Sequence, residues 1–438
     1  MSERSQPLAA LRGLLDRPLA SYYLLLSSAG LLVIIGLVMV FSATMVEAYA
    51  EVGSSFAAIA KQATWAVVGL FGFWFAQRLP VRTYRGIGRP LLVVSAILLA
   101  VLVVFPYVNA GPLRTEELWI ILGPIQVQPS EMAKFALLLW GADLLVRKGP
   151  KIALWRELAV PLFPTTAIIL VLVGFRDLGT MLIMLCMFMG LLWTAGVRLR
   201  LLGGMLSAGF VGAMVLVVLA SHRMERFVSF QNPEDYADDW GYQAIQGYYA
   251  IADGGWFGVG LGESKQKWEW LPNGHNDFIF ALIAEELGLV GCAVILALFA
   301  VLTYAGLRIA RRVSDPFRRL VAAGATFWLA GQAVINIGGV VGLLPITGVP
   351  LPLISDGGSA LVVTLVLLGM LASFARAEPE AAAALRARNP GKWVRVLWAP
   401  LPPLQRGGDR ERAQPARSRS RTDRDRSDRK RSDRNRTT

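Results

Sequence analysis

A group of polar and charged side chains stands directly before a long apolar segment, at residues 263–278. It contains Lys265 and Lys267, then His275, and finally Asp277 beside the first apolar residues. A carboxylate within hydrogen-bond reach of a hydroxyl can take up its proton during group transfer to an alcohol. Asp is also a preferred helix N-cap, so the pattern alone is more typical of a carboxylate that only begins the helix, and the two roles do not exclude one another. Beside cations and tryptophans, such a carboxylate suits a charged, lipid-linked substrate.

A second pair of charged residues, Glu131 and Lys134, opens another apolar segment. Residues three apart share one face of a helix, so the two side chains can form an ion pair. Intramembrane lysines usually face a cavity or a partner, and diphosphate binding by Lys134 is therefore an equal alternative. Ser130, preceded by proline, is the expected N-cap of this helix.

Two further candidates stand in short connections between apolar segments. Asp177 lies at a tight turn, where it can pair with Arg176 or face the same outer cavity as Asp277. Trp119 lies in an amphipathic segment. A tryptophan at the membrane interface is most often an anchor, and the same position would also let it support a sugar face or a lipid.

Two acidic residues, Glu285 and Glu286, lie about two turns inside the apolar segment that follows Asp277. On an ideal helix Glu285 falls nearer the Asp277 face, and Glu286 points away. Polar intramembrane residues usually pair with one another, so Gln332 and Asn336 are the expected partners of both.

The composition indicates a membrane protein. The chain has 438 residues, of which 55% are hydrophobic and 17% charged, with a mean hydropathy of +0.50, whereas soluble domains carry about 25% charged residues. The two cysteines and two histidines are too few and too far apart for a disulfide framework or a histidine-based metal site. No glycine-rich phosphate loop or nucleotide fingerprint is present, which argues against a nucleotide-sugar donor and against ATP-driven transport.

About ten apolar segments are long enough to cross a bilayer as helices. Lysine and arginine gather in the N-terminal segment, in every second connection and in the tail, and such an excess marks the cytoplasmic side. We therefore predict an all-α polytopic membrane protein with about ten transmembrane helices and both termini in the cytoplasm. The predicted segments are 21–46, 60–77, 90–108, 130–146, 158–175, 178–196, 201–220, 278–307, 320–342 and 358–377.

The predicted organisation has three parts. A cytoplasmic segment, 1–20, precedes a ten-helix membrane domain, 21–377, whose large extracytoplasmic loop, 221–277, joins spans 7 and 8. The connection 343–357 holds three prolines yet is apolar, which predicts an irregular segment that lines a cavity. The cytoplasmic tail, 378–438, begins with a short surface helix. From about Arg406 it is basic and too polar to fold alone, so it either binds anionic lipid or an acidic partner or remains solvated.

Several motifs together resemble one family of membrane proteins. QPSEMAK, DLGT, GYQAIQ, the long stretch that ends LPNGHNDF, and INIGGVVGLLPITGVPLPLIS follow one another in this order. Together they resemble the SEDS family (shape, elongation, division and sporulation), which includes RodA and FtsW. The resemblance covers nearly all of 20–378, and the LPNGHNDF variant is most similar to the FtsW of actinobacteria.

The resemblance implies an enzyme. A SEDS protein is a peptidoglycan glycosyltransferase that polymerises lipid II outside the cytoplasmic membrane, at the division septum for FtsW, and releases undecaprenyl diphosphate. The implied partners are a class B penicillin-binding protein, other division proteins and membrane lipids, with no nucleic acid. The implied mechanism is inverting: cations, or a divalent metal such as Mg²⁺, stabilise the departing diphosphate.

The resemblance also assigns roles to residues. The essential aspartate of the family falls on Asp277, which would activate the acceptor hydroxyl, and the essential tryptophan on Trp119. The remaining candidates are substrate-binding or supporting residues. They are Glu131, Lys134, Asp177, Lys265, Lys267, His275 and Ser359.

The sequence departs from the family pattern at charged positions. Glu116 and Glu117 stand where two arginines are usual, Arg176 where proline is usual, and Asp356 where an uncharged residue is usual. A lipid II flippase and a non-catalytic division scaffold are the competing interpretations. A flippase would be expected to continue its polar groups to the inner leaflet, whereas here they gather toward the outer side.

Overall fold

The computed structural model divides the chain into two compact units, Met1–Pro402 and Pro403–Thr438. The second unit lies outside the described residues, and it contains the whole basic tail predicted from about Arg406. Glu117 also lies outside the described residues. The domain boundaries at 20 and 377 therefore remain predictions. The described residues are 13, 15–54, 56–110, 113–116, 118–123, 125–149, 151, 156, 159–237, 240–268, 270–272, 274–387 and 400–401.

Each apolar segment predicted from the sequence forms a helix in the structure. By length and composition, seven helices among the described residues can cross a membrane: α2, α3, α4, α9, α12, α13 and α14. The mostly helical membrane fold is thus confirmed, and the count of about ten spans remains a prediction. The helices are α2 (Ala20–Val52), α3 (Ala57–Ala76), α4 (Val81–Val104), α5 (Pro129–Lys148), α7 (Leu162–Gly174), α8 (Leu178–Thr194), α9 (Leu199–Val218), α12 (Ile279–Arg312), α13 (Pro316–Val340) and α14 (Gly358–Arg376).

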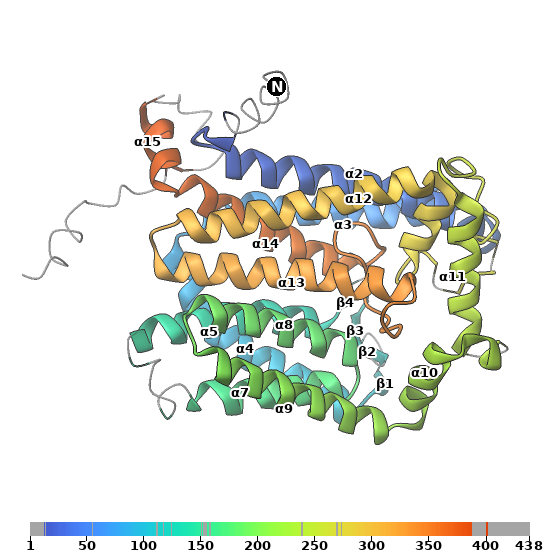
Figure 1. The fold of residues 1–438 in the computed structure, drawn as a ribbon, viewed down its shortest axis with the longest axis horizontal. Coiled ribbons are helices and arrows are strands. Elements are labelled where there is room, and N and C mark those ends of the chain that lie inside the picture. The colour runs from blue at the N-terminus through green and yellow to red at the C-terminus, as the bar shows by residue number, and fades with distance from the viewer. Residues whose placement is uncertain are drawn as a thin grey trace, which may run out of the picture. The chain divides into compact units, whose positions relative to one another are not determined.

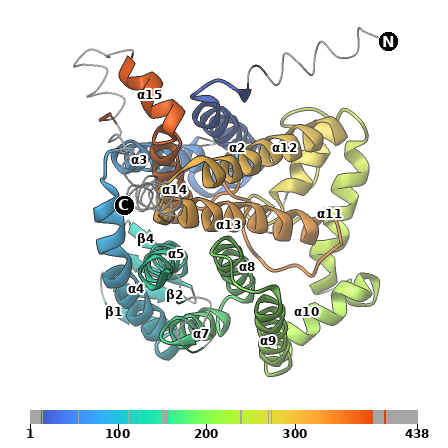
Figure 2. The same cartoon turned by 60° about the vertical axis from the view of Figure 1, so that its left-hand side comes forward.

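Helix α5 is not among these seven because it carries several charged residues, and it lies inside the protein. Most of its side chains are buried, including those of Glu131, Lys134 and Asp143. It contacts α4, α7, α8, α13 and α14, and Figure 2 shows it among these helices. A helix that touches protein on every side can carry charges that a lipid-facing helix cannot.

A small antiparallel sheet fills the connection between α4 and α5. Its strands are β1 (Tyr107–Ala110), β2 (Leu113–Glu116), β3 (Trp119–Leu122) and β4 (Ile125–Val127), in that order across the sheet. Trp119 stands opposite Glu116 at the β2–β3 turn. The prediction of an all-α fold missed this sheet, because strands of three or four residues leave only a weak periodic signal.

The outer loops predicted from the charge pattern gather at one end of the helices. Figure 1 shows α15 (Pro379–Ala387) and the start of α2 at one end, and the sheet, α10 (Ser221–Gln231) and α11 (Trp240–Gly254) at the other. The long loop 221–277 thus contains helices rather than an open coil. The short surface helix predicted after residue 377 is present as α15.

Helix α12 is interrupted at Gly288, whose φ of 67° and ψ of −168° are not helical. The loop after α11 docks there, with Val259 N donating to Glu285 O at 2.9 Å and Leu289 N donating to Gly255 O at 3.0 Å. A β-carbon at Gly288 would lie 2.3 Å from the backbone nitrogen of Gly258. Only glycine fits, and the break therefore fixes the long loop to the helix that follows Asp277.

Replacement of Gly288 by alanine is expected to destabilise the protein. The positive φ and the contact with the docked loop together cost on the order of 1–3 kcal/mol. Gly30→Ala is the matched control, since a β-carbon there meets nothing within 4 Å and alanine favours a helix. Thermal unfolding in detergent should show a lower midpoint for Gly288→Ala alone. Equal midpoints for the two variants would contradict the proposed role of the break.

Candidate active site

Asp277 is held by its backbone at the start of α12. The side-chain nitrogen of Asn336, on α13, donates to Asp277 O and to Val349 O, each at 2.7 Å. The N-cap of α12 is Phe278, without a side-chain cap bond. Oδ1 of Asp277 is buried and accepts no hydrogen bond from another residue. The structure therefore does not support the capping alternative, and it leaves the carboxylate without a capping role.

Burial changes the acidity of this carboxylate. Loss of hydration raises the pKa of Asp277 to about 6, against the opposing effects of its own backbone N–H and of Arg226. Desolvation disfavours the charged form of a carboxyl group and so makes the carboxylate a stronger base. A base whose pKa lies near the working pH is suited to proton transfer.

The segment 341–357 passes beside Asp277 without regular secondary structure, as its prolines predicted. A β-carbon on Gly348 would lie 3.8 Å from Oδ2 of Asp277. The backbone of the segment is held by side chains and by the neighbouring loop: Gln332 donates to Pro350 O at 2.8 Å, and Asp356 N donates to the carbonyl of His275 at 3.1 Å. The segment 341–357 and the loop before α12 are thus joined beside Asp277, and we call these two stretches together the wall.

Glu131 and Lys134 form the predicted ion pair, with 2.6 Å between Lys134 Nζ and Glu131 Oε1. Lys134 also donates to Gln332 Oε1 at 3.3 Å and lies 4.8 Å from the centre of the Trp328 ring. Because Gln332 bonds to Pro350, this pair supports the wall beside Asp277. The side chain of Lys134 is only 1% exposed. In this conformation it therefore supports the site through its bond to Gln332.

Asp177 caps α8, with Oδ1 accepting a hydrogen bond from Thr180 N at 2.8 Å. Burial raises the pKa of Asp177, opposed by the Thr180 hydrogen bonds and the charge of Lys134. A β-carbon on the neighbouring Gly179 would lie 2.3 Å from Val349, so the start of α8 packs closely on the segment that passes Asp277. The prediction that Asp177 faces the same region as Asp277 is compatible with this packing.

A pocket beside Asp177 lies between the sheet, α4, α5 and α7. Ser130 lines it, and its hydroxyl is buried without a hydrogen-bond partner. The prediction that Ser130 caps α5 is wrong, because the helix begins one residue earlier at Pro129 and its N-cap is Gln128. The lining residues are Leu99, Leu102, Leu118, Ser130, Leu172, Val173, Arg176 and Asp177.

The two predicted lysines lie in the docked loop rather than beside the carboxylate of Asp277. Lys265 is 77% exposed and pairs with Asp253 at 3.5 Å. Lys267 is buried and donates to the carbonyl of Gly262. Both belong to the loop after α11, which packs against the break in α12 at Gly288. We infer that they stabilise this loop.

The two acidic residues of α12 bond to different elements, Glu285 to the same loop and Glu286 to α2. Glu285 accepts hydrogen bonds from Ser264 Oγ at 2.5 Å and from Lys265 N at 2.8 Å. Glu286 accepts from Ser42 of α2, at 2.6 Å to Oε1. Their predicted pairing with the polar residues of α13 is wrong, because those residues bind the backbone of the wall instead.

The remaining candidates lie on neighbouring elements. His275 is partly buried, and its carbonyl joins the loop before α12 to Asp356. Trp119 is partly buried on β3. The hydroxyl of Ser359, in the first turn of α14, is buried without a hydrogen-bond partner. Their roles in binding remain predictions.

The sequence analysis missed two arginines of α10, Arg223 and Arg226. Arg223 Nη2 donates to Phe175 O at 2.7 Å, which joins α10 to the turn before α8. Arg226 is exposed and lies near enough to Asp277 to lower its pKa. Their spacing of three, which places both on one helix face, was the available signal.

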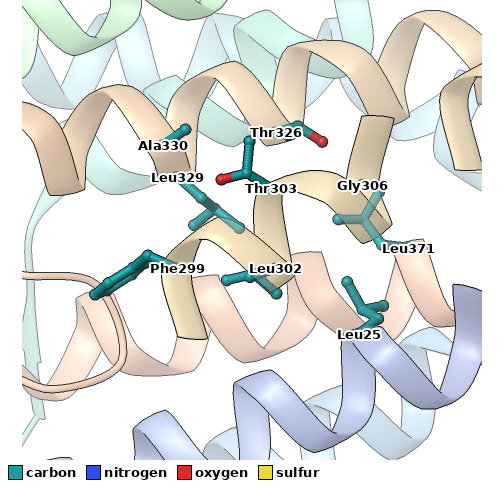
Figure 3. A pocket seen from close by; sticks show the side chains of 9 residues that line it. All are labelled: Leu25, Phe299, Leu302, Thr303, Gly306, Thr326, Leu329, Ala330 and Leu371. Atoms are coloured by element: carbon teal, nitrogen blue, oxygen red, sulfur yellow. The ribbon is translucent and has the colours of Figure 1, made fainter. Parts of the chain in front are cut away.

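No cluster of metal-binding side chains accompanies these residues in the described part of the chain. Within the described part of the chain, no group of three His, Cys, Asp or Glu side chains is placed to hold a metal ion, so we derive no step through Mg²⁺. Figure 3 shows a second pocket, between α2, α12, α13 and α14, whose lining side chains carry no titratable group. They are Leu25, Phe299, Leu302, Thr303, Gly306, Thr326, Leu329, Ala330 and Leu371.

Comparison with known protein families gives one match over most of the chain. The sequence model of FtsW, RodA and SpoVE, described as cell cycle protein, matches residues 22–380. The "Probable peptidoglycan glycosyltransferase FtsW" of Mycobacterium tuberculosis is 44% identical over 422 residues, which is 93% of this chain and 80% of the relative. The stage V sporulation protein E of Bacillus subtilis is 38% identical over 351 residues, 79% of this chain and 94% of the relative.

Solved structures show the same fold. A chain from the work on "Structural coordination of polymerization and crosslinking by a peptidoglycan synthase complex" matches with a TM-score of 0.65 and 29% identity, covering 80% of this chain and 96% of that one. The rod shape determining protein RodA of Thermus thermophilus matches with a TM-score of 0.59 and 28% identity, covering 81% and 96%.

Removal of one member of the buried pair is expected to destabilise the fold. Lys134→Met leaves Glu131 buried without its cation, a change that typically costs about 3–5 kcal/mol. The double variant Glu131→Gln, Lys134→Met removes both charges and should recover most of the thermal midpoint. If the single and double variants unfolded at the same temperature, the pair would not be the support described here.

Proposed function

This chain belongs to the family of FtsW, RodA and SpoVE, and on that premise we propose that it polymerises lipid II into glycan strands, with Asp277 as the general base. It is a membrane glycosyltransferase of peptidoglycan synthesis. The observation that carries the role of Asp277 is its environment. Burial raises the pKa of its carboxyl group, and Asn336 fixes its backbone beside an irregular segment. The charge pattern of the connections predicts that this end of the bundle is the extracytoplasmic one.

The reaction moves one proton and one glycosyl group. The carboxylate of Asp277 takes the proton from the 4-hydroxyl of the acceptor sugar as that oxygen bonds to the anomeric carbon of the donor. The bond from the anomeric carbon to the diphosphate breaks, and its electron pair leaves with undecaprenyl diphosphate. Attack from the face opposite the leaving group inverts the configuration. Asn336 and the wall around it hold the base in position.

The distribution of polar groups favours an enzyme over a lipid II transporter. The polar side chains described above meet near the starts of α8 and α12, at the end that the charge pattern places outside. The pocket between α2, α12, α13 and α14 is lined mostly by apolar side chains, with two threonines and no titratable group. A headgroup that crossed the bilayer would need polar partners through the inner half as well.

The partners and location of the chain form part of the proposal. A relative of the same fold comes from work on a peptidoglycan synthase complex that joins polymerization to crosslinking. We propose that this chain likewise works with a class B penicillin-binding protein, in the cytoplasmic membrane at the division septum. Other division proteins and membrane lipids complete the assembly.

Asp277→Asn is expected to abolish glycan polymer while preserving the fold. Loss of a general base typically lowers the rate 10²–10⁴-fold, and asparagine has nearly the same shape. The measurement is a gel of products from lipid II with the full chain and its partner transpeptidase. Asp235→Asn, an exposed acid in the same long loop, is the control and should polymerise normally. Full activity of Asp277→Asn would remove the catalytic role, and lipid II crossing without polymer would favour the transporter.

The initial polymerisation rate is expected to fall as the pH drops through about 6. The base must be ionised, so activity is full about one unit above this pKa and declines roughly tenfold per unit below it. Stability changes in the opposite sense: the folded state binds the proton more tightly, so ionisation of Asp277 disfavours folding as the pH rises from about 4 to 6. Rates that stayed constant from pH 8 down to pH 5 would argue against this base.

A further inference from the structure

Helices α2 and α12 are joined by two polar contacts, one toward each end of the pair. At the inner end, Arg308 donates from Nε to Ser21 Oγ at 3.0 Å. At the outer end, Ser42 Oγ donates to Glu286 Oε1 at 2.6 Å. Between these two contacts neither helix carries a charged residue.

The spacing of the two contacts matches the thickness of a bilayer. At 1.5 Å per residue, Ser21 and Ser42 lie about 32 Å apart along α2, and Glu286 and Arg308 lie about 33 Å apart along α12. The hydrocarbon core of a bilayer is about 30 Å thick. The uncharged stretch is therefore just long enough to cross the hydrocarbon, and the contact between Ser42 and Glu286 lies at the level of its outer boundary.

Part of the loop after α11 reaches below this level. Residues 254–262, GGWFGVGLG, contain no charged residue and are flanked by acidic residues on both sides; we call them the apolar turn. Val290 N donates to Trp256 O at 3.1 Å, and Val290 lies about 6 Å from Glu286 toward the inner end of α12. Figure 1 shows the loop, in yellow, beside the outer ends of α2 and α12.

The apolar turn replaces hydrogen bonds that α12 lacks. In a continuous helix the N–H groups of residues 289–290 would bond to the carbonyls of residues 285–286. The break at Gly288 frees these four groups, and the turn pairs with each of them. The pairs are Val259 N with Glu285 O, Gly260 N with Glu286 O, Leu289 N with Gly255 O and Val290 N with Trp256 O. Irregular backbone can lie at the depth of lipid only where protein satisfies its polar groups, and these bonds do so.

The side chains of the apolar turn point away from the protein. Trp256 is 70% exposed, Phe257 82% and Leu261 56%. On the neighbouring surface of α12, Leu289 and Val290 are exposed as well, and they lie within the uncharged stretch that crosses the hydrocarbon. The apolar surface of the turn is thus continuous with the surface of α12 that lipid covers.

We infer that the apolar turn inserts into the outer leaflet of the membrane and binds lipid through Trp256, Phe257 and Leu261. Tryptophan is favoured where hydrocarbon meets the headgroups, and apolar side chains gain the hydrophobic free energy of leaving water. The lipid surface is the partner of this part of the long loop. Its binding does not depend on the catalytic role of Asp277.

Insertion of the apolar turn also fixes the height of the start of α12. Because the turn is bonded to α12 at the break, the helix cannot slide along the membrane normal without moving the turn out of the lipid. Ile279 lies about 10 Å outside the level of Glu286. The polar region of a bilayer adds about 5–7 Å on each side, so the start of α12 stands at the outer edge of the headgroups.

The test measures the depth of residue 257 with a nitroxide label. Phe257→Cys is made in the full chain with both native cysteines, Cys186 and Cys292, replaced by alanine, and the protein is reconstituted in vesicles of phosphatidylcholine and phosphatidylglycerol. Collisions of the label with oxygen, which dissolves in lipid, should exceed those with a water-soluble nickel complex, at a depth of about 6 Å inside the hydrocarbon. Val294→Cys, on the exposed side of α12, should behave likewise, and the exposed Asp235→Cys should show the reverse. A label at 257 as accessible to nickel as the label at 235 would overturn the inference.

A second measurement needs no cysteine variant. The tryptophan fluorescence that Trp256→Phe removes from the chain should be quenched in vesicles whose lipids carry bromine near the headgroup end of the acyl chains. If this component of the fluorescence were unquenched by bromine at every acyl position, the turn would not lie in lipid.

A third arm distinguishes lipid from protein as the occupant. The nitroxide measurement at residue 257 is repeated with the transpeptidase partner present, and the label should be shielded from nickel equally with and without it. Shielding that appeared only with the transpeptidase would assign the turn to a protein interface and overturn membrane binding. No readout uses polymer, so a failure of the polymerase proposal would leave these results unchanged.

Discussion

The need to satisfy backbone polar groups at the membrane surface determines how this site is built. A loop that leaves helical geometry beside lipid must find hydrogen bonds from protein, because hydrocarbon provides none. Asn336 supplies two, to Asp277 O and Val349 O, and Gln332 supplies one to Pro350 O. Helix α13 thereby joins the loop before α12 to the segment before α14, and the position of Asp277 follows from these bonds.

The same constraint explains why charged residues lie inside the bundle. Lys134 and Glu131 neutralise one another and Lys134 bonds to Gln332. Glu285 fastens the long loop against α12, and Glu286 joins α12 to α2. Glycine at 288 lets that loop approach the helix backbone. Lys134, Glu131 and Glu285 thus help to position the segments around the site, and the raised pKa of Asp277 follows from the water that these segments exclude.

The helices of the fold could be predicted from the sequence, because the length of an apolar segment is a local signal. The position of Asp277 and the Glu131–Lys134 pair were also visible, since each depends on residues close together in the chain. The sheet was missed because its strands are very short. The partners of Glu285 and Glu286, and the approach of α10 to both aspartates, depend on packing between residues tens to hundreds of positions apart, which periodicity does not report.

The most direct test of the account is a structure of the chain with its transpeptidase and lipid II, trapped by an inactive variant at Asp277. The measured quantity is the distance from the side chain at 277 to the acceptor 4-hydroxyl. The account predicts hydrogen-bond reach, about 2.6–3.2 Å or one water between them. An acceptor hydroxyl bound at another part of the bundle, out of reach of residue 277, would contradict it.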